Sequence, residues 1–201
     1  MTDNTQLTNG RARHGLLQRC RDLIQDKSGV GAVEFAFVAP ILVVMYIGAV
    51  EVSLALAVDT KLSRAGNLTL DLITQGTGTS RAELAAMEDV AQSVMAPYDA
   101  SDVELKFTAI QVSADGTEAR VVWSWGNEEL KPYTENAVID IPDSLMIADS
   151  YYVRGEILKT HNFITTIEFT PAPSATELDL DETYYMRPRL GTEVNCSDCN
   201  D

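Results

Sequence analysis

The sequence predicts an α+β fold in which one long N-terminal helix precedes a short helix and an antiparallel β-sheet of three to five strands. No helix-stopping signal except Pro40 interrupts residues 30–73. A helix N-cap signal follows at Ser80, and segments of alternating apolar and polar residues then flank turn residues. We expect three parts: a leader of residues 1–29, a helix of residues 30–75 and an α+β domain of residues 80–201.

The first half of the long helix has the composition of a membrane span. Residues 35–50 carry no charge, and the apolar character continues past Glu51 to Val58. A bilayer span needs about 20 apolar residues, and a proline such as Pro40 is tolerated in membrane helices. Because Lys and Arg are more frequent before this segment than after it, we expect a cytoplasmic N-terminus and an exported domain. Glu51 is expected near the far membrane interface, where its carboxylate can reach water.

Beyond the membrane segment, side chains at helical spacing predict that the same helix continues: Leu62, Ala65, Thr69, Leu72 and Ile73. The stretch "TQGTGTS" of residues 74–80 then ends it. Residues 80–97 predict a second helix, with Ser80 as its N-cap and Glu83 completing a capping box.

The rest of the chain predicts strands. Residues 103–113 and 117–126 flank "ADG" and predict a hairpin. Strict alternation along the second of these strands places four side chains on one face: Ala119, Val121, Trp123 and Trp125. Two tryptophans on one strand face are typical of a core, and a binding platform is the alternative. A long connection of residues 127–144 leads to further strand candidates in residues 150–160, 163–171 and 181–190.

The charge distribution argues against several classes of function. Residues 59–201 hold ten basic and twenty-five acidic residues, so the domain repels phosphate backbones and nucleic acid is not an expected partner. The stretch "LDLDE" at 178–182 lacks the glycine and ligand spacing of a calcium loop and is expected to be a solvated acidic edge. With His14 and His161 as its two histidines, and with no phosphate loop, the sequence predicts neither an enzyme nor a cofactor or metal site.

The cysteines fit an exported domain. Cys20 lies in the leader, where the cytoplasm keeps thiols reduced, whereas Cys196 and Cys199 lie on the exported side. We expect the latter two to form a structural disulfide. Half a zinc site and a redox centre are the alternatives, and His161 could supply only one further metal ligand.

The start of the long helix carries a recognisable motif. Gly29 is followed five residues later by Glu34 and then by the apolar run, a pattern that resembles the processing signal of type IV pilins and pseudopilins. The segment "GAVEFAFVAPILVVMYIGAVE" of residues 31–51 is more closely similar to the TadE-like family of the tight adherence (Tad) pilus system. The positions that match its pattern are Glu34, Phe35, Pro40, Gly48 and Glu51. Val52 and Ser53 stand where the family usually has Phe and Gly.

The resemblance implies a pilin-like fold and a function in filament assembly. A prepilin peptidase would cut between Gly29 and Val30, and the new ammonium of Val30 would lie one helical turn from Glu34. That ammonium, on this subunit or the next, would offset the cost of a carboxylate near the bilayer, which is below about 3 kcal/mol. The implied protein is a single-pass inner-membrane minor pilin or pseudopilin of bacteria. Its domain lies in the periplasm or, within the pilus, at the cell surface.

The partners that the resemblance implies are the prepilin peptidase, other minor pilins, the major pilin, the inner-membrane assembly platform and membrane lipid. Three alternatives remain open at the level of the sequence. The chain could be an uncleaved, membrane-anchored periplasmic binding domain. The stretch "ALA" at 55–57 could be a signal peptidase site. Cys196 and Cys199 could serve a tethered redox enzyme.

Overall fold

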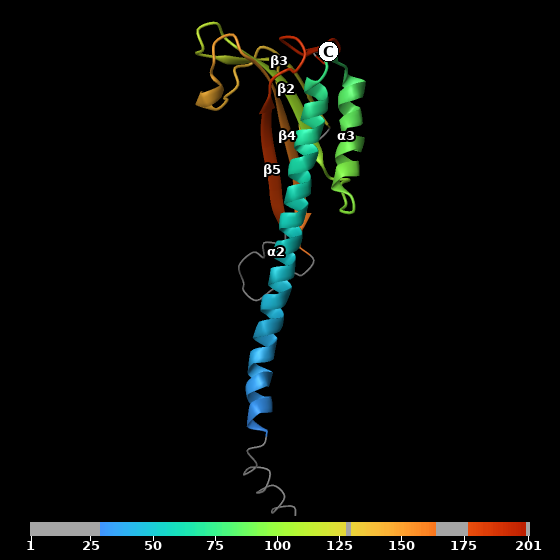
Figure 1. Ribbon diagram of the computed structural model, residues 1–201, viewed down its shortest axis with the longest axis vertical. Helices are drawn as coiled ribbons and strands as arrows, with labels where there is room; N and C mark the ends of the chain where they lie inside the picture. The colour runs from blue at the N-terminus through green and yellow to red at the C-terminus, as the bar shows by residue number, and fades with distance from the viewer. Residues whose placement is uncertain (1–28, 128–129, 164–176, 200–201) are drawn as a thin grey trace, which may run out of the picture. The chain divides into compact units, whose positions relative to one another are not determined.

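Residues 29–127, 130–163 and 177–199 are described by the computed structural model, and their elements follow the predicted α+β order (Figure 1). The helices are α2, Val30–Thr74, and α3, Arg81–Met95, with a short 3-10 helix at Asp143–Leu145. The strands are β1 Gly78–Thr79, β2 Glu104–Val112, β3 Ala119–Gly126, β4 Tyr151–Asn162, β5 Glu177–Met186 and β6 Asn195–Cys196. The chain divides into two compact units between Ala49 and Val50. The predicted leader, apart from Gly29, lies outside the described residues.

Helix α2 confirms the long helix expected from the sequence. It begins directly after Gly29, contains Pro40 and continues without a break for 45 residues. It ends where the glycine-containing break was predicted, and the Thr74 hydroxyl donates to the carbonyl of Leu70 at 3.1 Å. The amide of Arg189 donates to the Thr74 carbonyl at 2.9 Å and so satisfies one of the carbonyls that a helix end leaves unpaired.

Helix α3 confirms the predicted capping box. The Ser80 hydroxyl accepts the amide of Glu83 at 3.3 Å, and the Glu83 carboxylate accepts the amide of Ser80 at 2.9 Å. At the other end, the ammonium of Lys61 on α2 donates to the carbonyls of Val94 and Ala96, both at 3.1 Å. A cation at this end is favourable because the helix C-terminus carries partial negative charge. Lys61 therefore ties the two helices together.

The main sheet has four antiparallel strands in the order β3-β2-β4-β5, within the predicted range of three to five. The predicted hairpin is β2 and β3, and the segments predicted at 150–160 and 181–190 contribute to β4 and β5. Most of the strand predicted at 163–171 lies outside the described residues. A separate pair of short strands, β1 and β6, is parallel and joins the start of α3 to the C-terminal segment.

A β-bulge corrects the predicted face of β3. Ala109 of β2 pairs with Trp123, but the next residue of β2, Ile110, pairs with Val121, so Val122 is an extra residue in the ladder. Trp123 therefore faces the core beneath the helices, whereas Val121 faces the opposite side of the sheet. The prediction of one shared face was wrong because strict alternation holds only where the pairing register is continuous.

The sheet is covered on both faces. One face packs against α3 and the second half of α2, and this core includes Trp123 and Trp125, as predicted for the tryptophans. The connection of residues 133–146 covers part of the other face around Ile110 and Tyr152. Helix and sheet approach closely at Gly66, where an added Cβ would lie 2.9 Å from side-chain carbons of Ile157 and Tyr184. Only glycine fits this contact without a shift of its neighbours.

Candidate functional site

The first half of α2 exposes a continuous apolar surface. Between Val30 and Ala49, Ala39 and Ile47 are half-buried and every other residue is exposed; Phe37 is 72% exposed. Within the described part of the chain, α2 is the helix that is long and apolar enough to cross a membrane. A helix that is apolar on all sides needs an apolar environment, either lipid or other helices. Val30–Ala49 is therefore the exposed part of a candidate membrane-spanning helix.

Glu34 is the charged residue of this surface. It lies on α2 four residues after Val30, in the second helical turn. The carbonyl of Gly29 accepts the amides of Ala32 and Val33, each at 3.1 Å, so Gly29 forms the N-terminal end of the helix. Cleavage after Gly29 would remove this carbonyl and leave the amine of Val30 at the start of an already helical segment. The pairing of that amine with Glu34 stays a prediction.

The structure places all five matched positions of the motif on one helix: Glu34, Phe35, Pro40, Gly48 and Glu51. Phe35 and Pro40 are exposed, and nothing lies within 4 Å of a Cβ built at Gly48. The four matched positions from Glu34 to Gly48 are therefore accessible to lipid or to another chain.

Glu51 differs from the expectation. It is 8% exposed, whereas the sequence led us to expect a carboxylate that reaches water. It is the first buried residue of α2. All ten buried residues of α2 lie from Glu51 onward. Further contacts fix this half, including a 2.8 Å hydrogen bond between the hydroxyls of Ser63 and Tyr184.

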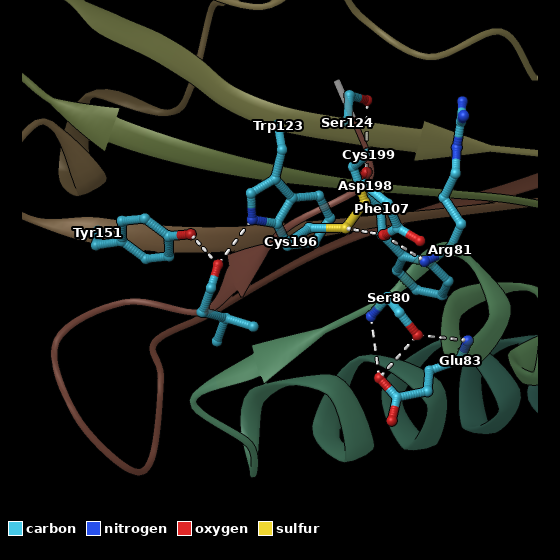
Figure 2. The surroundings of a disulfide bond; sticks show 11 residues. Ser80, Arg81, Glu83, Phe107, Trp123, Ser124, Tyr151, Cys196, Asp198 and Cys199 are labelled. Atoms are coloured by element: carbon cyan, nitrogen blue, oxygen red, sulfur yellow. Dashed lines mark hydrogen bonds between the residues drawn. A yellow bond between two sulfur atoms is a disulfide. The ribbon is translucent and has the colours of Figure 1, made fainter. Parts of the chain in front are cut away.

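A second group of interactions holds the body together at its C-terminal end. We call residues 189–199 the C-terminal clasp. Its Val194 carbonyl accepts two hydrogen bonds, from the indole of Trp123 and from the phenol of Tyr151, both at 2.7 Å (Figure 2). Val194 is fully buried, and burial raises the pKa of Tyr151 to about 12. Two strands are thus fixed to one backbone carbonyl of the clasp.

The disulfide predicted from the cysteine spacing is part of this clasp. Cys196 and Cys199 are joined, and Asp198 between them accepts the amide of Arg81 at 2.9 Å (Figure 2). Arg81 is the first residue of α3, next to the capping box, so the disulfide loop supplies a carboxylate to a helix N-terminus. Arg189 at the other end of the clasp forms an ion pair with Asp71 of α2.

A zinc site at the cysteines gains no support from this geometry. The two sulfur atoms are bonded to each other and so are not thiolate ligands. His161, the further ligand considered, lies ten residues from Tyr151 at the opposite end of β4, or about 30 Å along the strand. Because Tyr151 contacts the clasp, His161 is remote from both cysteines.

Sequence reasoning missed most of the clasp. The cysteine spacing pointed to residues 196–199, but no local signal connects Val194 with Trp123 or Tyr151. These contacts join segments separated by 71 and 43 positions. An aspartate between two closely spaced cysteines is the signal that could have suggested a helix cap.

Comparison with known proteins gives one match. A family model described as TadE-like protein matches residues 29–67. The match confirms the TadE-like resemblance for the first part of α2 and indicates a protein associated with the Tad pilus, with an N-terminal membrane helix. No curated protein and no solved structure matches the chain. The strands and α3 lie outside the matched residues.

Proposed function

We propose that this protein is a minor pilin or pseudopilin of a Tad pilus, cut by a prepilin peptidase between Gly29 and Val30. It assembles through the first half of α2 and primes or caps the filament. The observation that carries the proposal is the helix itself. It begins at the residue after Gly29, its residues 30–67 lie within the TadE-like match, and none of its residues 30–49 is buried.

The chemistry of the helix start supports this function. Before cleavage, Glu34 is the charged residue in an apolar segment and has no cation on its own helix before Lys61. Cleavage creates an ammonium at Val30, one turn away, and each filament neighbour brings another. A carboxylate in an apolar medium is stabilised by such a partner. Glu34 would therefore favour the register in which neighbouring helices place an amine beside it.

The folded body supports a minor role. The helix alone would suffice for a subunit that only builds the filament shaft, whereas this chain adds a covered sheet, a second helix and a disulfide-closed clasp. A body of this size suits a subunit present in few copies at one end of the filament. In this proposal the N-terminus is cytoplasmic before processing, and the body is exported to the periplasm, where Cys196 and Cys199 oxidise. The peptidase, the assembly platform and other pilins are its partners.

The alternative is an uncleaved anchor that carries a periplasmic binding domain. A strain lacking the native gene, complemented with the full-length protein or with Glu34→Gln, separates the two functions. We expect Glu34→Gln to reach the membrane in normal amount but to abolish piliation, counted by electron microscopy. Glu135→Gln, the same change at an exposed position of the body, is the matched control and should restore pili. Normal piliation with Glu34→Gln would contradict an assembly role and favour the anchored domain.

A further inference from the structure

The two edges of the main sheet differ in how far their outward backbone groups are covered by other parts of the chain. The β3 edge is covered by the chain's own segment 136–139. The amide of Val121 donates to the Ala137 carbonyl at 3.0 Å, and the Val121 carbonyl accepts the amide of Asn136 at 2.9 Å. The amide of Ile139 donates to the Ala119 carbonyl at 2.9 Å. The backbone groups of β3 that point away from β2 are therefore partly used.

The opposite edge is β5, which pairs with β4 alone among the described residues. Figure 1 shows β5 at the border of the sheet, away from α3. All ten residues from Glu177 to Met186 pair with β4 in unbroken register. Half of the backbone N–H and C=O groups of such an edge strand point outward and can accept another strand.

Several usual protections of a sheet edge are missing from β5. Edge strands are commonly short, bulged, interrupted by proline or lined with lysine. β5 has ten residues in continuous register, with neither proline nor a basic residue. Acidic side chains are the protection against strand pairing that β5 does have. Glu177, Asp179 and Asp181 are exposed and alternate on the face away from α2, and Thr160 donates to Asp179 at 2.8 Å.

This charge pattern selects the strand that can be added. A second copy of β5 would bring its own carboxylates opposite Glu177, Asp179 and Asp181, and like charges directly across a strand pair are destabilising. A strand with Lys or Arg at alternate positions would instead place a cation opposite each acid. We propose that β5 is a docking edge for an extended segment of another protein, with basic residues at every second position, which joins the sheet as a fifth strand. This inference does not depend on the pilus function.

The probe is a nine-residue peptide that alternates lysine and valine, added to the full chain in nanodiscs of zwitterionic lipid. Two control peptides have the same length: one carries glutamate in place of lysine, and one is N-methylated at alternate backbone nitrogens. Binding is measured by fluorescence anisotropy, and its location by amide hydrogen exchange. We expect the lysine peptide to bind and to slow exchange in residues 177–186. N-methylation should abolish binding because it removes the ladder donors while keeping the charge.

The variant Asp179→Lys/Asp181→Lys should bind the lysine peptide about tenfold more weakly or worse, and should gain affinity for the glutamate peptide. Its control is Asp89→Lys/Glu135→Lys, which changes the net charge equally at exposed positions off the strand. Equal binding by the N-methylated peptide, or equal weakening by both variants, would reduce the interaction to non-specific attraction and overturn the proposal. Slow amide exchange at every residue of 177–186 in the chain without peptide would also overturn the proposal. The outward-pointing amides of β5 would then already be hydrogen-bonded within the chain itself.

Discussion

The two halves of α2 form one continuous helix but have opposite surroundings. From Val30 to Ala49 no residue is buried, whereas from Val50 to Thr74 ten are. Both halves are rich in apolar residues, but residues 30–49 carry one charged side chain and residues 50–74 carry five. The arrangement differs as well, because the second half concentrates buried positions on one side, including Val58, Leu62 and Ala65, at spacings of three and four.

The comparison separates two uses of apolar surface within one element. In the second half, one stripe packs on the sheet and the remaining side carries polar residues such as Asp59 and Arg64. In the first half every side is apolar, which fits an environment that surrounds the helix. We therefore expect the second half to determine the stability of the body, and the first half to determine insertion and assembly.

The largest expected effect contrasts the same substitution in the two halves. Leu62 is fully buried, and Leu62→Ala should lower the free energy of unfolding of the body by about 2 to 5 kcal/mol. Leu42 is 54% exposed, and Leu42→Ala should change the free energy of unfolding by less than about 0.5 kcal/mol. Chemical denaturation in micelles, followed by tryptophan fluorescence, measures this because Trp123 and Trp125 both lie in the body core. Equal losses of unfolding free energy in both variants would contradict the proposal that the second half of α2, and not the first, stabilises the body.

The next effect depends on pH and concerns the body alone. The folded-state pKa of Tyr151 is about 12, above its ordinary value of 10.0. Its contribution to stability is therefore complete below pH 10 and is lost as pH rises through about 12. We expect the free energy of unfolding to fall by about 2 to 3 kcal/mol over that range because of this group.

Tyr151→Phe provides the test of that assignment. It should cost about 1 kcal/mol at pH 7, from the lost hydrogen bond to Val194, and should show a shallower alkaline decline. Some decline should remain because burial also raises the pKa values of Tyr184 and Tyr185. Identical pH profiles for Tyr151→Phe and the wild type would show that Tyr151 does not titrate as its burial requires.

The smallest expected effect again compares matched positions in the two halves. A methyl group at Gly66 meets Ile157 and Tyr184 at 2.9 Å, so Gly66→Ala should destabilise the body by about 1 to 2 kcal/mol despite the better helix propensity of alanine. Nothing lies within 4 Å of the corresponding position at Gly48, so Gly48→Ala should not destabilise the body. Thermal unfolding of both variants in micelles measures the difference. A Gly66→Ala protein as stable as wild type would mean that helix and sheet are not packed this closely.

Local features of the fold could be predicted from the sequence, and long-range ones could not. The extent of α2 and the Ser80–Glu83 capping box follow from residues close in the chain, and both are confirmed. The bulge at Val122 was missed because a register shift depends on the partner strand as well as on the alternation within β3. The burial of Glu51 was also missed, because burial depends on what packs around a residue and the sequence of its own helix does not show this.

The candidate site also has a part that could be predicted from the sequence and a part that could not. The motif from Glu34 to Glu51 could be identified because its residues are neighbours on one helix. Of the clasp, the sequence predicted the pairing of Cys196 with Cys199 but not the contact of Val194 with Trp123 and Tyr151. Every residue has a backbone carbonyl, so the residue type at position 194 does not indicate this contact. It could be identified only from the structure.

The intact mass of the mature protein, purified from its native host with the export machinery active, tests the central claim most directly. Processing after Gly29 predicts a chain that begins at Val30 and lacks the mass of residues 1–29. A chain that retains Met1 would leave Glu34 without a nearby terminal amine, and a chain cut after Ala57 would lack Glu34 altogether. Either result would contradict the proposed assembly function.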